Sequence, residues 1–234
     1  MIELGVICSA CGEAATHSVG AILLDQDAAA EADDARGWTR AVYVPMSITC
    51  PSCAAVDEHR IVPESGRALV VDDQIVMGGR AALSDGTPIH TPSEGIALLR
   101  SRAELRPDHG LGWRALGNFA LRAGRSEEAM EAYHRGAAIE GELTCALAVA
   151  TDAVARGVEA APELVLRAVE RVTLAEPRFR PLQAAQLAEL LRKLGARAPA
   201  FLIDGDAIDP RDVRDWQRLG EQLAIAKTIR QGGA

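Results

Sequence analysis

Two short cysteine pairs restrict what this chain can fold into more than any other feature of its sequence. The first pair, in CSACG, is Cys8 and Cys11, and the second, in ITCPSC, is Cys50 and Cys53. Each CxxC turn directs two sulfurs toward one point, so two such turns brought together offer four thiolates in a tetrahedral set. Zn²⁺ prefers that geometry and such soft ligands. The spacing therefore predicts one structural Zn²⁺ per chain, bound by all four cysteines.

The segments around the pairs indicate how the two turns come together. Two β-like runs, 16–24 and 38–49, lie between the pairs, and the acidic stretch 25–37 between these runs predicts a mobile loop. Short apolar runs at 67–71 and 74–77 predict a hairpin that extends the same sheet. Gly12 suits the turn after Cys11, because glycine accepts a left-handed backbone. This order of turn, strand, return strand and turn is that of a zinc ribbon.

Other functions of cysteine pairs predict different sequence patterns. A redox dithiol needs only one CxxC, usually at a helix start that lowers a thiol pKa, and two disulfides would suit a secreted chain. Redox chemistry and an iron site stay open beside zinc, whereas a catalytic zinc would need an open position that four cysteines close. Cys145 lies alone in an apolar helical run and is expected in the core. His17 and His59 are expected near the turns but not among the ligands.

The second cysteine pair also resembles part of a known family. The stretch TCPSC (49–53) is similar to the second motif of the bacterial CpXC domain, which has two such motifs at a comparable separation. The first pair lacks the proline, and Ala54 stands where that family usually has glycine. The resemblance implies a metal-binding β-rich domain at the N-terminus.

The second half of the sequence has helical periodicity from Ser93, which is a candidate N-cap. The Gly/Pro-rich stretch 78–92 precedes it and is expected to be a linker. We therefore expect an α+β protein with a zinc ribbon and extended hairpin over 1–77 and an all-α antiparallel helical array over 93–234. A last helix within 210–230 is expected to cap that array.

Part of the helical half resembles the tetratricopeptide repeat, a pair of antiparallel helices of 34 residues. Trp113, Leu116 and Gly117 fall on the W-x₂-L-G positions of the motif, and Ala129 and Tyr133 on its alanine and large aromatic positions. A half repeat precedes this stretch and a degenerate one follows it. Since one repeat cannot bury its apolar face alone, the resemblance implies a short array that binds a protein or peptide partner in its groove.

Arg114 and Asn118 are the candidate peptide-binding residues of this groove. They lie four residues apart, one turn from each other, at positions where the family often has a basic residue and an asparagine. Plain solvent exposure is the alternative for Arg114. Since no phosphate loop, GxSxG or HExxH is present, we expect a non-enzymatic adaptor.

The charge distribution bears on which class of partner the chain can bind, and its hydropathy bears on where in the cell it is expected. The net charge is −8, and residues 1–90 have 13 acidic against 5 basic residues, while the remainder has 20 of each. Binding to a phosphate backbone needs clustered cations, so nucleic acid is disfavoured, and a zinc-ribbon nucleic-acid-binding or regulatory protein is kept as the alternative. No signal peptide or membrane-spanning stretch is visible, so a cytoplasmic location is expected.

Overall fold

The computed structural model describes residues 1–71, 76–140, 142–172 and 180–196. They form two compact units, which are described separately. Unit 1 is Met1–Leu105 with Asn118–Ala129, and unit 2 is Arg106–Gly117 with the described residues from Met130 on. The expected boundaries at 77 and 93 stay a prediction. The segment 198–210 and the last expected helix lie outside the described residues.

The first sheet of unit 1 has β1 (Ile2–Cys8) at its centre. β2 (Ala14–Val19) and β5 (His59–Ile61) pair antiparallel with its two edges. Alternate side chains of β1 are buried, from Ile2 to Cys8, as expected for a strand with one face on a core. The strand therefore ends with its cysteine facing the interior.

The second sheet is smaller and mixed. β3 (Ile22–Leu24) lies between β4 (Val42–Tyr43), which is antiparallel to it, and β6 (Val76–Gly78), which is parallel. The predicted strand 16–24 is thus two strands, one in each sheet. The predicted return strand 38–49 is also wrong for most of its length, because only two of its residues pair with β3.

The acidic stretch 25–37, predicted as a mobile loop, contains two short helices instead. These are α1 (Gln26–Ala30) and α2 (Ala35–Ala41). The Asp25 carboxylate accepts from the Ala28 amide at 3.2 Å and that of Asp34 from the Gly37 amide at 2.7 Å, so both aspartates are N-caps. Trp38 is only 3 % exposed within α2. The acids that indicated a loop are the ones that begin the helices.

The predicted strand 67–71 is wrong as well, because it belongs to α3 (Pro63–Val71). Pro63 occupies the first helical position, where a missing N–H costs nothing. Ser65 accepts from the Gly5 amide at 2.8 Å and so fixes α3 beside β1. Gly66 faces the Trp38 ring, and the contact leaves no room there for a Cβ atom.

From Pro92 on, the regular elements of the described chain are all helices, as the periodicity predicted. Six helices follow: α4 (Pro92–Leu105), α5 (Gly110–Arg122), α6 (Ser126–Ala137), α7 (Leu143–Arg156), α8 (Ala161–Val172) and α9 (Arg180–Lys193). Together with the sheets they confirm the α+β class. The N-cap of α4 is Thr91, two residues earlier than the expected Ser93, because Thr91 Oγ accepts from the Glu94 amide at 3.2 Å.

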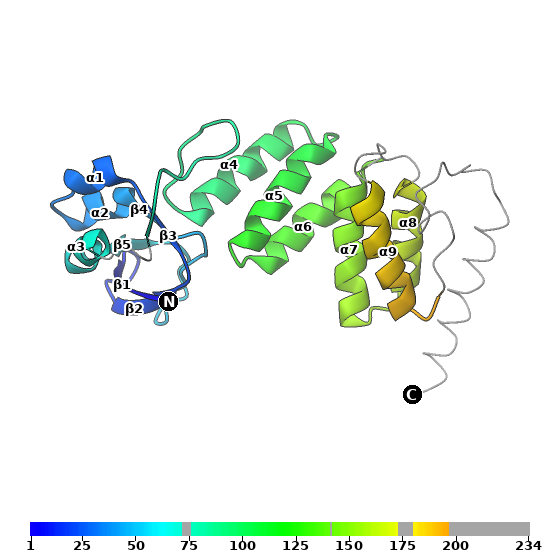
Figure 1. Ribbon diagram of the computed structural model, residues 1–234, viewed down its shortest axis with the longest axis horizontal. Coiled ribbons are helices and arrows are strands. Elements are labelled where there is room, and N and C mark those ends of the chain that lie inside the picture. The colour runs from blue at the N-terminus through cyan, green and yellow to red at the C-terminus, as the bar shows by residue number, and fades with distance from the viewer. Residues whose placement is uncertain (72–75, 141, 173–179, 197–234) are drawn as a thin grey trace. The chain divides into compact units, whose positions relative to one another are not determined.

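The helices recur at nearly constant spacing. α4, α6 and α8 begin at Pro92, Ser126 and Ala161, which are 34 and 35 residues apart. α5 and α7 begin at Gly110 and Leu143, which are 33 residues apart. Within unit 2, α7, α8 and α9 lie side by side (Figure 1) and share one apolar core. α9 begins at Arg180, 37 residues after the start of α7, so the spacing is closest to constant from α4 to α8.

A close glycine contact and a buried tryptophan fix the packing of α5 against α6. A Cβ atom at Gly117 would lie 2.5 Å from the Tyr133 ring. Trp113 is 4 % exposed, and its indole N–H donates to the Pro107 carbonyl at 2.9 Å. The Arg135 guanidinium of α6 lies over the indole, 4.9 Å from the ring centroid. Trp113 is therefore a central packing residue of α5.

Replacing Trp113 with alanine should lower the free energy of unfolding of unit 2 by about 3–5 kcal/mol, the usual cost of removing a large buried aromatic side chain. Leu111→Ala is the matched control, because Leu111 is 49 % exposed on the same helix. It should change that free energy by less than about 0.5 kcal/mol. Denaturant titration followed by circular dichroism measures both, and equal losses would show that Trp113 does not pack as described.

Candidate metal centre

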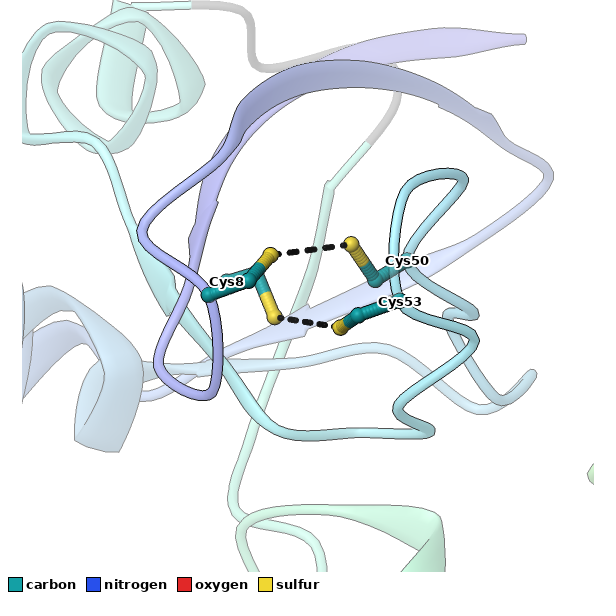
Figure 2. A group of neighbouring side chains, drawn as sticks. Cys8, Cys50 and Cys53 are labelled. Atoms are coloured by element: carbon teal, nitrogen blue, oxygen red, sulfur yellow. Dashed lines mark hydrogen bonds between the residues drawn. The ribbon is translucent and has the colours of Figure 1, made fainter.

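The two CxxC turns face each other because sheet pairing brings their flanking strands together. Cys8 is the last residue of β1, and His59 of β5 is its antiparallel partner. The second turn lies in a hairpin closed by a bridge between Thr49 and Val56, and β5 begins soon after it. The chain thus returns to β1 directly after Cys53. Figure 2 shows the sulfurs of the two turns pointing toward one another.

The two turns have the same hydrogen-bond pattern. In each, the amide of the first cysteine donates to the carbonyl five residues on, and the amide four residues on donates back to the carbonyl of that cysteine. The four bonds are Cys8 N to Glu13 O (2.8 Å), Gly12 N to Cys8 O (2.9 Å), Cys50 N to Ala55 O (2.8 Å) and Ala54 N to Cys50 O (3.0 Å). The equivalence means that both pairs present their sulfurs in the same way.

The residue after each second cysteine has a left-handed backbone. Gly12 has φ +79°, which confirms the role predicted for it, and Ala54 has φ +59°. Glycine adopts this conformation freely, whereas a side chain costs roughly 1–2 kcal/mol. The second turn therefore contains strain that the first avoids.

The sulfur positions fit a tetrahedral metal ion. The Cys8 and Cys53 sulfurs lie 3.6 Å apart and those of Cys11 and Cys50 lie 3.7 Å apart, while all four lie within 4.8 Å of one another. With zinc–sulfur bonds of about 2.3 Å, the edge of a regular tetrahedron is about 3.8 Å. The four cysteines predicted from the sequence are thus brought together at the spacing that such an ion needs.

Electrostatics also favours a cation here. Amide N–H groups of Cys53 and Ser52 point at the Cys50 sulfur and lower its pKa to about 7. For Cys11 a backbone hydrogen bond from Glu13 acts in the same sense, but the neighbouring sulfurs, led by Cys53, and desolvation raise the pKa to about 12. The Cys50 thiolate forms readily, whereas Cys11 and Cys53, whose pKa values are raised, resist ionisation beside it. A dication removes this conflict, because it stabilises several thiolates at once.

The competing interpretations differ in how well they fit. All five cysteines are free thiols, and the sulfur separations are far longer than the S–S bond of about 2.05 Å, so the chain does not contain the two disulfides. Cys8 ends a strand and Cys50 follows a bridge residue, so neither pair starts a helix as redox pairs usually do. Zinc and iron both fit the sulfur geometry. Cys145 is fully buried in α7, as expected.

Two histidines lie beside the centre without joining the four sulfurs. His17 and His59 line a small cavity together with Cys8 and Cys50. Burial, opposed by the Asp57 carboxylate, lowers the pKa of His59 and so favours the neutral ring. Within the described part of the chain, neither His17 Nε2 nor His59 Nδ1 has a hydrogen-bond partner. These rings border the sulfur cluster and shield it on one side.

The predicted groove residues are both on α5. Arg114 is partly exposed, and its guanidinium lies 3.6 Å from the Glu142 carboxylate and 3.5 Å from the Thr144 hydroxyl. The Asn118 side chain is half-buried, and the backbone carbonyl of Asn118 accepts from the Arg122 guanidinium at 3.2 Å. Their role in binding a peptide stays a prediction, and Arg114 has a structural contact that the sequence did not reveal.

Comparisons with protein-family models, with curated proteins and with solved structures find no match to this chain. Within the described residues, no helix has the length and apolar character needed to cross a membrane.

Substitutions at the two left-handed positions, Gly12 and Ala54, should change the unfolding free energy in opposite directions. Gly12→Ala should lower the unfolding free energy of the metal-loaded protein by about 1–2 kcal/mol, because alanine is strained at φ +79°. Ala54→Gly should raise it by up to about 1 kcal/mol, since relief of strain exceeds the extra chain entropy of glycine. Gly20→Ala is the control, because an added Cβ there has no neighbour within 4 Å and no left-handed backbone. Equal effects at Gly12 and Gly20 would show that the turn geometry is not as described.

Proposed function

We propose that this protein is a non-enzymatic, zinc-binding adaptor whose helical half binds a protein or peptide partner. The observation that supports the metal role most strongly is the set of four sulfurs within 4.8 Å of one another. Four thiolates complete the coordination of Zn²⁺ and leave no position for a substrate or an activated water. The ion would therefore stabilise the fold of unit 1. A zinc ribbon related to CpXC domains remains our interpretation of this part.

The interpretation as a tetratricopeptide-like array draws on the helix spacing and on two contacts. Helix starts 33 to 35 residues apart agree with a 34-residue repeat. Gly117 against Tyr133 and the buried Trp113 agree with the close approach that the motif residues serve. Proteins with such stacked helix pairs bind extended or helical peptides along the face of the first helix of each pair.

The outward face of α5 has the chemistry for a peptide with apolar side chains. Leu111 and Leu121 are 49 % and 52 % exposed, and at 100° per residue they fall within the same third of the helix as Arg114 and Asn118. Exposed leucines in one row beside a cation and an amide can anchor apolar side chains and hold polar groups. We therefore assign partner binding to this face of α5.

One Zn²⁺ per chain should be found by elemental analysis of protein purified without added metal. Cys50→Ser should abolish the metal and unfold the two sheets, since structural zinc contributes about 10–16 kcal/mol of apparent binding free energy in small domains. Cys145→Ala removes a thiol in α7 and should keep one zinc, which makes it the matched control. Stoichiometric iron, or folded sheets without metal, would contradict the zinc assignment.

Partner binding is tested on the exposed leucines, because Arg114→Ala would also leave the buried Glu142 carboxylate without its cation, at about 1–3 kcal/mol. Leu111→Ser with Leu121→Ser should leave the thermal midpoint nearly unchanged and remove the proteins that the wild-type chain retains from a lysate of its source organism. Leu105→Ser, at an exposed position of α4, should retain them. Equal retention by all three proteins, quantified by mass spectrometry, would exclude this face of α5.

A further inference from the structure

Asp57 is a buried carboxylate four residues after Cys53, the last residue of the second cysteine pair. It is 7 % exposed and has φ +60°, a left-handed conformation that aspartate tolerates better than most residues. Its amide donates to the Ile48 carbonyl at 2.8 Å, and one carboxylate oxygen accepts from the Ile48 amide at 2.8 Å. These two bonds close the hairpin 48–57 that contains Cys50 and Cys53. Asp57 is thus part of the frame of the second cysteine turn.

The other carboxylate oxygen of Asp57 faces a different element. It accepts from the Ser93 amide at 2.9 Å and from the Ser93 hydroxyl at 2.7 Å, besides the Ser47 hydroxyl at 3.0 Å. Ser93 lies in the first turn of α4, where amides have no partner within the helix. Thr91 and Glu94 satisfy the neighbouring amides locally, as a capping box does. The Ser93 amide is satisfied by a residue 36 positions earlier.

Further contacts join the hairpin to the same region of unit 1. The Ser47 amide donates to the Ala123 carbonyl at 3.0 Å, just after the end of α5. The Arg125 guanidinium donates to the Ser93 hydroxyl at 3.2 Å and also pairs with Glu128. The Ser93 hydroxyl therefore links the Arg125 guanidinium to the Asp57 carboxylate. Removal of the Asp57 carboxylate would leave both Ser93 and Ile48 with unsatisfied donors.

We propose that Asp57 couples the occupancy of the metal centre to the N-terminus of α4. The hairpin 48–57 places Cys50 and Cys53 at the ion and Asp57 at α4, so the ion that fixes the sulfurs also fixes the carboxylate. Without the ion, four crowded thiols lose the charge that holds them together, the hairpin loosens, and the Ser93 amide loses its acceptor. The metal state of the centre is in this way transmitted to the first described helix of the helical half. The inference goes beyond the proposed adaptor role and needs only that the four cysteines bind a metal.

Hydrogen exchange of the full-length chain tests this coupling, with zinc content measured on the same samples. Removing zinc with a chelator should increase amide exchange in the first turn of α4 by about tenfold or more, because a charge-assisted cap is lost. Exchange in α8 should not change. In Asp57→Asn, which should still bind one zinc, the first turn of α4 should exchange fast even when loaded, and chelation should add little.

Two more variants make the test specific. Asp85→Asn is the matched control, because the Asp85 carboxylate pairs with Arg102 of α4 but is half-exposed and distant in sequence from the hairpin. It should behave as the wild type does. Ser93→Ala keeps the amide and removes one of the two bonds to Asp57, and should give an intermediate effect if Asp57→Asn fails to fold. If the wild type binds zinc but amide exchange in the first turn of α4 does not change when zinc is removed, the coupling alone is overturned. If the purified chain contains no metal, the proposed zinc role is overturned as well.

Discussion

The convergence of four sulfurs is the interaction on which unit 1 depends. The sheets are small, with three strands each, and β3, β4, β5 and β6 have only two or three residues. Pairing so short gives little stability by itself, and the core beneath it is limited to the residues around Trp38 and Leu4. The four cysteines could hold an ion that supplies what the sheets lack, because it would fix two turns that are about 40 residues apart in sequence. The chain between the turns would then form one closed loop.

The chemistry of the centre was predictable because it is local. The CxxC spacing, the glycine after Cys11 and the soft ligand set determine the turn within a few residues, and those features are visible in the sequence. The helical half was predictable for a similar reason, since periodic apolar positions persist over many turns. Trp113 and Gly117 identify the close approach of α5 and α6 because only particular side chains fit it.

Other parts of unit 1 were not predictable in the same way. Asp25 and Asp34 suit a loop and a helix start equally well until the partner amides are known. The run at 67–71 is too short for its period to separate a strand from the end of a helix, and only the contact of Gly66 with Trp38 decides it. Asp57 was missed because its partner Ser93 is 36 residues away, and no spacing rule connects them. For α3 and for Asp57, the deciding contacts join residues that are distant in sequence.

The equivalence of the two cysteine turns has a consequence for the order of folding. Each turn closes through hydrogen bonds within six residues, so Cys8 and Cys11 can form their half of the centre as soon as they are synthesised. The other half follows only after a chain segment of roughly 40 residues, and closing a loop of that length costs about 3 kcal/mol of entropy beyond a constant. Until that loop closes, the first turn presents its two thiols without the two ligands of the second turn.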